Sequence, residues 1–167
     1  MNAITFFDAE SYFTTLCETN RLAAAHGFKP CTCSGIADLQ GPLDRFKSAN
    51  AFFCIDDTND GQMYMGRGGG WYKKRTFTVF IMHRYRFNDE SDRIGKLAVC
   101  RQLFRQMASR MLIDSKQLEN DLVYLGVGNI LSRELGQYFM NGCTGLYFMI
   151  DVEEPVDLKY NPSEWTA

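Results

Sequence analysis

A long alternation of apolar and polar side chains over residues 72–87 is the feature that most constrains the fold of this chain. The apolar positions are Phe77, Val79, Ile81, Tyr85 and Phe87, and the polar positions are Thr76, Thr78, Arg84 and Arg86. Period-two alternation is typical of a β-strand with one face on a core. At ~3.3 Å per residue the strand would be roughly 50 Å long, so we expect it to bend or to project beyond the domain.

The next segment, residues 92–113, has the three-and-four spacing of an amphipathic helix. Its apolar positions are Leu97, Cys100, Phe104, Met107 and Met111, and its outward basic positions are Arg93, Lys96, Arg101, Arg105 and Arg110. Asp89 or Ser91 is a suitable N-cap. A helix with one apolar stripe must bury that stripe, so we expect it to lie on the sheet.

An earlier helix is predicted over residues 9–26. Asp8 can accept hydrogen bonds from the first turn, and Phe7 is placed to pack against Tyr12. Gly27 is suited to the left-handed conformation that ends many helices.

The other predicted elements are short strands separated by turn residues. Residues 28–49 indicate one short strand followed by loops, because two prolines and two glycines interrupt them. The remaining predicted strands are 51–56, 62–65, 122–127, 135–140 and 143–152. Asn141-Gly142 between the last two is a strong signal for a type I′ hairpin turn. In the final strand Leu146, Phe148, Ile150 and Val152 share one face, which we expect to be core.

These elements predict an α+β fold, with an antiparallel or mixed β-sheet that contains a long β-hairpin and is packed by two main α-helices. Residues 1–154 form a single domain in this interpretation, since 167 residues suit one core. Residues 155–167 carry two prolines and no periodicity, so we expect a C-terminal tail or arm.

Composition narrows the classes of function. The chain is 46% hydrophobic and 23% charged, which is typical of a globular protein. A net charge of −2 argues against a general nucleic-acid binder. Asp8 and Glu10 stand where a signal peptide would be basic and then apolar, and no apolar run reaches the ~18 residues of a membrane span. We therefore expect a soluble protein made in the cytoplasm, with its six cysteines as free thiols.

The glycine-rich segment 65–71 invites comparison with a phosphate-binding loop. No Lys-Ser or Lys-Thr pair follows the glycines, and the segment leads into a strand instead of a helix. A mobile hairpin loop is the better interpretation. The loop is locally basic, and an acidic partner surface remains possible. The candidate interface residues here are Arg67, Trp71, Lys73, Lys74 and Arg75.

Residues 56–61 resemble the opening of a calcium-binding EF-hand loop. With Gly61 at the sixth position, the twelfth position is Arg67, where a bidentate glutamate is required. A turn in which Asp and Asn side chains bond to their own backbone explains the segment better, so no metal site is predicted.

No catalytic arrangement is recognisable in the sequence. Cys31 and Cys33 lack the second ligand pair of a structural zinc site. His83 lies in the long strand, where a packed imidazole is favoured over a catalytic base; a Cys–His catalytic pair stays open as a third interpretation. We therefore predict a protein that is not an enzyme and that needs no cofactor.

Taken together, this order of elements resembles the phage tail-terminator and tail-completion proteins, of the minor tail protein U type. The matching features span residues 5–154: the first helix, the hairpin running into strand 72–87, helix 92–113, and residues 133–142 leading into 146–152. The glycine-rich tip and the tail after Pro155 have no counterpart. The resemblance implies a hexameric ring that ends the tail tube, contacts tube and head-connector proteins, and resides in the host cytoplasm or in the virion tail.

The tail after Pro155 carries two aromatic side chains. The tail aromatics Tyr160 and Trp165 are candidates to anchor in a neighbouring subunit, because Trp and Tyr are common at interfaces.

The rival interpretation of the function is a small binding module for an acidic protein or a nucleic acid, using Arg67, residues 73–75 and the arginines of helix 92–113. The basic face of that helix is otherwise a solvated surface. The principal partner expected is a further copy of the chain, with no membrane and with nucleic acid disfavoured.

Overall fold

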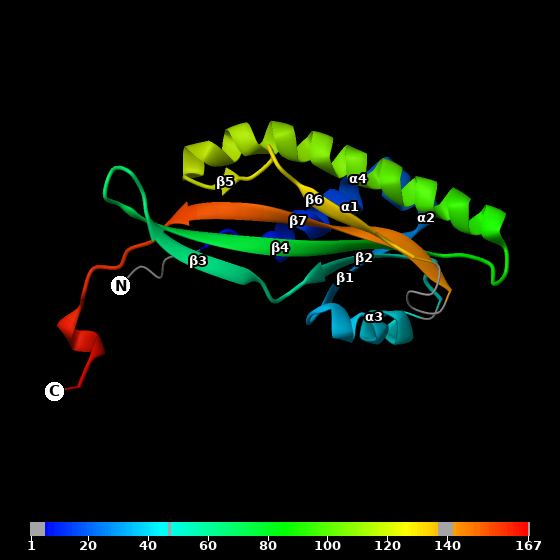
Figure 1. The fold of residues 1–167 in the computed structure, drawn as a ribbon, viewed down its shortest axis with the longest axis horizontal. Coiled ribbons are helices and arrows are strands. Elements are labelled where there is room, and N and C mark those ends of the chain that lie inside the picture. The colour runs from blue at the N-terminus through cyan, green and yellow to red at the C-terminus, as the bar shows by residue number, and fades with distance from the viewer. Residues whose placement is uncertain (1–5, 47, 137–141, 167) are drawn as a thin grey trace.

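The computed structural model describes residues 6–46, 48–136 and 142–166, which form a mixed sheet of seven strands packed by helices (Figure 1). The strand order is β1-β2-β4-β7-β5, with β3 added to β4 and β6 added to β7. The strands are β1 Phe28–Cys33, β2 Ala51–Asp56, β3 Asp60–Met65, β4 Trp71–Arg84, β5 Tyr124–Leu125, β6 Leu131–Leu135 and β7 Cys143–Pro155. β1 and β2 are parallel, and the other pairs are antiparallel. The predicted α+β class with a mixed sheet is confirmed.

The α-helices of the described residues are α1 Ala9–Thr19, α2 Arg21–His26, α3 Gln40–Arg45 and α4 Glu90–Leu118. Short 3₁₀ turns occupy Ile36–Asp38, Glu119–Asp121 and Pro162–Glu164. α4 and α3 lie on opposite sides of the sheet (Figure 1). None of the helices in the described ranges is long and apolar enough to cross a membrane.

The prediction of one helix over residues 9–26 is wrong, because the helix breaks at Asn20. Asn20 has extended backbone angles (φ −85°, ψ 127°), and its side chain accepts a hydrogen bond from the Ala23 amide at 2.8 Å. Its amide group also donates to Gln106 of α4 at 2.9 Å. The predicted ends are confirmed: Asp8 caps α1 through the Ser11 amide, and Gly27 ends α2 at φ +66°.

The loops predicted within residues 28–49 contain a helix, α3. Pro42 lies in the first turn of α3, where a backbone amide would have no partner inside the helix. Proline at this position is therefore compatible with a helix. Leu39 and Leu43 pack from this segment onto Phe52 and Phe80 of the sheet.

The long strand β4 ends at Arg84, three residues before the predicted end, and Phe87 is 86% exposed instead of facing the core. The chain turns here because Asp92 of α4 accepts a hydrogen bond from the Arg86 amide at 2.8 Å. Asn88 then adopts a left-handed conformation (φ 58°) and Asp89 caps α4, as predicted.

The strand predicted over residues 122–127 is reduced to β5, because Leu122 is left-handed (φ 60°) and begins no ladder. The second-last strand is predicted over residues 135–140, whereas β6 ends at Leu135. Residues 137–141 lie outside the described residues, so of the predicted Asn141-Gly142 turn the structure describes only Gly142, with φ +80°. β7 confirms the strand predicted over residues 143–152 and continues to Pro155.

Two cores lie on the two faces of the sheet. The larger contains Phe77, Val79 and Ile81 of β4 under the helices α1, α2 and α4. On the other face Phe80 and Met82 are 2% and 0% exposed beneath α3. The sequence pattern predicted that this second face of β4 carries polar residues. That prediction holds for the first half of the strand but not for Phe80 and Met82.

Candidate functional site

A hairpin formed by β3 and the first half of β4 projects beyond the end of α4 (Figure 1). In its register Met65 is opposite Trp71 and Met63 is opposite Lys73. Directly opposed residues share a face of a sheet. Trp71 and Lys73 occupy odd-numbered positions of β4, and so does Phe77, which is buried under the helices. The hairpin face that carries Trp71 and Lys73 therefore extends the helix-covered face of the sheet.

No described helix covers the apolar side chains at this end of the sheet. Met63 is 51% exposed, Met65 61% and Trp71 43%. We call these three residues the hairpin patch. Trp71 is among the interface residues predicted from the sequence, whereas Met63 and Met65 are not, although their alternation within a predicted strand could have indicated them.

The loop at the hairpin tip is closed by its own backbone. The Gly66 amide donates to the Gly70 carbonyl at 2.7 Å, and Gly69 has φ +87°, which side chains rarely tolerate. Arg67 is exposed on this loop. The segment runs into β4 and not into a helix, so the geometry of a phosphate-binding loop is not formed.

The structure separates the predicted basic cluster. The Lys73 ammonium lies over the Phe6 ring at 4.9 Å, on the hairpin-patch face. Lys74 points to the opposite face, where it pairs with Asp151 at 3.7 Å. Both of these predicted interface lysines thus contact other groups of the same chain.

Arg75 is part of a buried ion pair and not of an exposed basic surface. Its guanidinium donates to Glu154 at 3.0 Å and to the Phe7 carbonyl at 2.8 Å. The side chains of Arg75 and Glu154 are only 14% and 6% exposed. Glu154 also accepts a hydrogen bond from the Phe7 amide. This pair fixes the segment before α1 onto β4 and β7.

The outward arginines of α4 have acidic or amide partners within the same chain. Arg101 pairs with Glu134 of β6 at 2.6 Å, and Arg110 with Asp114 at 2.9 Å. The remaining pairs are Arg93 with Glu90, Lys96 with Asp92, and Arg105 with Gln102. The basic stripe predicted for an acidic partner is largely neutralised.

The tail leaves the sheet after Pro155, at the end of the molecule that carries the projecting hairpin (Figure 1). The Val156 amide donates to the Trp71 carbonyl at 3.0 Å, so the tail starts beside the hairpin patch. Tyr160 and Trp165 stack on each other with ring centroids 6.4 Å apart, and each is 68% exposed. The hairpin and the tail therefore bring exposed aromatic side chains to one end of the molecule.

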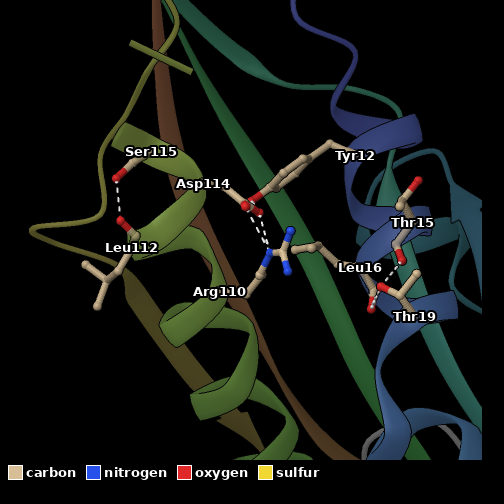
Figure 2. A network of polar contacts seen from close by, with 8 residues as sticks. All are labelled: Tyr12, Thr15, Leu16, Thr19, Arg110, Leu112, Asp114 and Ser115. Atoms are coloured by element: carbon tan, nitrogen blue, oxygen red, sulfur yellow. Dashed lines mark hydrogen bonds and ion pairs between the residues drawn. The ribbon is translucent and has the colours of Figure 1, made fainter. Parts of the chain in front are cut away.

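Polar contacts between α1 and α4 line a cavity of about 450 Å³. Figure 2 shows Tyr12 reaching from α1 to Asp114 of α4; its hydroxyl donates to the carboxylate at 2.9 Å, and Arg110 bonds to the same carboxylate. Burial and the Asp114 carboxylate raise the pKa of Tyr12, so its hydroxyl stays protonated at neutral pH. The arrangement joins the two helices and offers no general base from this tyrosine.

The candidates for thiol or imidazole chemistry do not meet. His83 is 4% exposed, with Nδ1 2.8 Å from the Arg84 carbonyl, and it lines a cavity with His26, Arg86 and Lys96. Cys31 lines a different cavity. The Cys–His pair left open by the sequence is not formed in the described structure.

No group of three or more potential metal ligands gathers among the residues that the structure describes. In the EF-hand-like segment the Asp56 carboxylate accepts hydrogen bonds from the Thr58 amide and hydroxyl at 2.9 and 2.7 Å. The side chain is thus used in its own turn, as predicted.

Comparison with known proteins identifies no relative: no family model matches the sequence, and no curated protein matches it. The features of this chain that bear on function are therefore the hairpin patch, the tail and the surrounding charges.

Proposed function

We propose that this chain is a structural assembly protein of a phage or prophage tail, forming a ring that ends the tail tube and joins it to the head. The order of elements suggests the family, and the hairpin patch is the observation that supports assembly. Its three large apolar side chains lie on a face that is core elsewhere in the sheet. Exposed apolar surface of this kind marks sites of protein association.

Ring formation fits the placement of this surface. A closed ring uses a head-to-tail contact, in which a patch on one subunit meets a different patch on the next. The hairpin patch and the tail aromatics lie at one end of an elongated sheet, so they can reach a neighbour without displacing the subunit's own core (Figure 1).

The backbone of the hairpin also favours assembly. Within the described part of the chain β3 pairs only with β4, which leaves the other edge of β3 with unpaired amide and carbonyl groups. Sheet edges of this kind attract further strands unless they are covered. A neighbouring subunit would cover this edge.

The rival interpretation, a module for an acidic protein or a nucleic acid, is less well supported. Of its proposed contacts, Arg75 and Lys74 form ion pairs within the subunit, and so do three arginines of α4, Arg93, Arg101 and Arg110. Arg105 of the same helix bonds to the neutral Gln102. Paired charges offer little to a polyanion, whose binding depends on cations that replace its counterions.

Light scattering across a range of protein concentrations tests the proposal. We expect a mass of roughly six subunits, as for a closed ring. Met65→Asp places a charge in the hairpin patch and should weaken association by about tenfold or more, because desolvating an unpaired charge opposes the contact. Gln62→Asp is the matched control, since Gln62 is exposed on the opposite face of the same strand. A strict monomer at high concentration, or equal effects of both variants, would contradict the proposal.

A further inference from the structure

We propose that Cys31 is a reactive thiol that peroxide oxidises to a disulfide with Cys54, linking strands β1 and β2. This inference concerns a modification site and does not depend on the proposed role in a tail. It stands on the register of the two strands, on the different exposure of the two sulfurs, and on the cations beside Cys31.

The parallel register of β1 and β2 brings the two cysteines together. Cys31 is paired with Cys54, and their Sγ atoms are 2.7 Å apart. Neighbouring strands are about 4.8 Å apart, which is within the range of about 4.4–6.8 Å that disulfides span between Cα atoms. The bond can therefore form without a change of register.

The two sulfurs differ in access. Cys31 is half-buried and lines a surface cavity of about 330 Å³ on the edge strand β1, together with Lys29, Arg45 and Phe46. Cys54 is 0% exposed in the core beneath α3. A small oxidant reaches Cys31 first, and Cys54 lies behind it as the second thiol.

Two cations, Lys29 and Arg45, line the cavity of the accessible thiol together with Glu10 and Glu18 of α1, and of these charges the two cations act on the pKa of Cys31. The Arg45 guanidinium donates to the Thr32 carbonyl at 3.1 Å, beside Cys31 in the same strand. The Lys29 ammonium lies 5.1 Å from the centre of the Phe46 ring in the same cavity. The hydrogen bond from Cys54, together with Arg45 and Lys29, lowers the pKa of Cys31 against the opposing effect of burial. Cations and thiol donors favour the nucleophilic thiolate.

The other four cysteines serve as internal controls. Cys17, Cys33, Cys100 and Cys143 are at most 2% exposed. Burial raises the pKa of Cys17, Cys33 and Cys100 to about 12 and that of Cys143 to about 11. Buried neutral thiols react slowly with peroxide and with alkylating agents. Selective reaction at Cys31 is therefore the expected outcome.

The proposed reaction uses hydrogen peroxide as the oxidant. The Cys31 thiolate attacks one peroxide oxygen, an S–O bond forms, the O–O bond breaks, and hydroxide leaves and takes a proton to become water. Cys54 then attacks the sulfenic sulfur, an S–S bond forms, the S–O bond breaks, and a second water leaves after taking the Cys54 proton. The two thiols lose two electrons in total, and one peroxide gains them.

The result would be an edge strand tied covalently to the sheet. Within the described residues β1 pairs only with β2, so its other edge is open to solvent or to a partner. A disulfide at its centre would oppose fraying of this edge, because β1 could no longer separate from β2.

Peptide mapping of the folded wild-type protein tests the proposal. After brief treatment with hydrogen peroxide and alkylation of the remaining thiols, trypsin releases Cys31 in residues 22–45 and Cys54 in residues 48–67. We expect these two peptides to be joined by a disulfide, and fragmentation on either side of Thr32 to place the bond at Cys31 and not at Cys33. Cys17, Cys100 and Cys143 should be recovered as alkylated thiols, because peroxide leaves them unoxidised. Absence of the joined peptides, or a bond at Cys33, would overturn the proposal.

Alkylation rates give a second and independent readout without oxidant. At neutral pH iodoacetamide should modify Cys31 at least about fivefold faster than any other cysteine of the folded protein, and Arg45→Gln should slow this reaction by about threefold. Cys33→Ser is the matched control and should leave the rate at Cys31 unchanged. Equal rates at Cys31 and at the buried cysteines would contradict the inference.

Discussion

At the scale of single residues, Gly145 has the tightest steric surroundings that the structure shows for a glycine. It lies in β7 opposite Met82 of β4, with φ +154°. A Cβ atom added there would lie 2.0 Å from the Ile81 carbonyl oxygen. Two central strands approach each other at this point only because no side chain separates them.

Gly145→Ala should therefore lower the free energy of unfolding by about 3 kcal/mol or more, because a backbone atom and not a flexible side chain must move. Gly128→Ala is the control: an added Cβ at Gly128 would meet nothing within 4 Å, and the change should stay within about 0.5 kcal/mol. Urea denaturation measures both. A small loss of stability in Gly145→Ala would show that β4 and β7 separate more easily than the structure indicates.

His83 gives a pH dependence whose sign can be stated. Burial lowers its pKa below the usual value; Lys96 and His26 act in the same direction, against the Arg84 carbonyl and Asp92. Protonation of His83 is then more favourable in the unfolded chain than in the folded one. The neutral, buried imidazole therefore contributes its full stability above about pH 6.5, and this contribution is lost as the pH falls through the lower pKa of the folded state. Between about pH 6.5 and pH 5 the wild type should lose more stability than His83→Phe. Parallel stability curves in urea titrations at these pH values would refute this expectation.

Which single residues could be predicted from the sequence depends on the range of their interactions. Asp8, Gly27 and Asp89 were predicted correctly because a cap bonds to backbone groups within a few residues. Gly145 and the Cys31–Cys54 contact depend on the pairing of strands distant in sequence. No local pattern contains that information.

At the scale of elements, α1 and α4 are joined by the polar network of Figure 2. Tyr12→Phe removes the hydroxyl that bonds to Asp114, keeps the ring that packs on Phe7, and should lower the free energy of unfolding by about 1 kcal/mol. Thr15→Val is the control in the same helix, since the Thr15 hydroxyl bonds only to its own helix backbone at 2.9 Å. Thermal unfolding compares the two; equal effects would mean that the bond between the helices adds no stability.

The N-terminal segment depends on the buried Arg75–Glu154 pair. Glu154→Gln leaves the Arg75 charge without its counterion in a largely buried place and should lower the free energy of unfolding by about 3 kcal/mol. The neighbouring Glu153 lies on the other face of β7, so Glu153→Gln should change the free energy of unfolding by less than about 1 kcal/mol. Chemical denaturation provides the measurement. Similar small effects would show that solvent screens the Arg75 charge.

The elements themselves were predictable where one periodicity dominated. The alternation in β4 and β7 and the helical spacing in α4 were recognised. The break at Asn20 was missed because an amide side chain that caps α2 and contacts Gln106 has no signature inside an otherwise helical pattern. Phe80 and Met82 were missed as a second core because α3, which covers them, was itself predicted to be loop.

At the scale of the whole molecule, the protein is an elongated sheet whose α-helices stop short of one end (Figure 1). The same strand face is core in the middle of the sheet and is exposed at the hairpin patch. From the length of the strand the sequence predicted either a bend or a projection beyond the domain. It could not show which apolar residues would remain uncovered, because that depends on where α4 ends relative to the hairpin.

The length of tail tubes in electron micrographs tests the central claim most directly. Under the proposed function, lysates of a strain that carries this gene would be compared with those of a deletion strain and of strains that express Met65→Asp or Gln62→Asp. We predict tubes of uniform length joined to heads for the wild type and Gln62→Asp, and overlong tubes without heads for the deletion and Met65→Asp. Tubes of normal length, joined to heads, in the deletion strain would contradict the account.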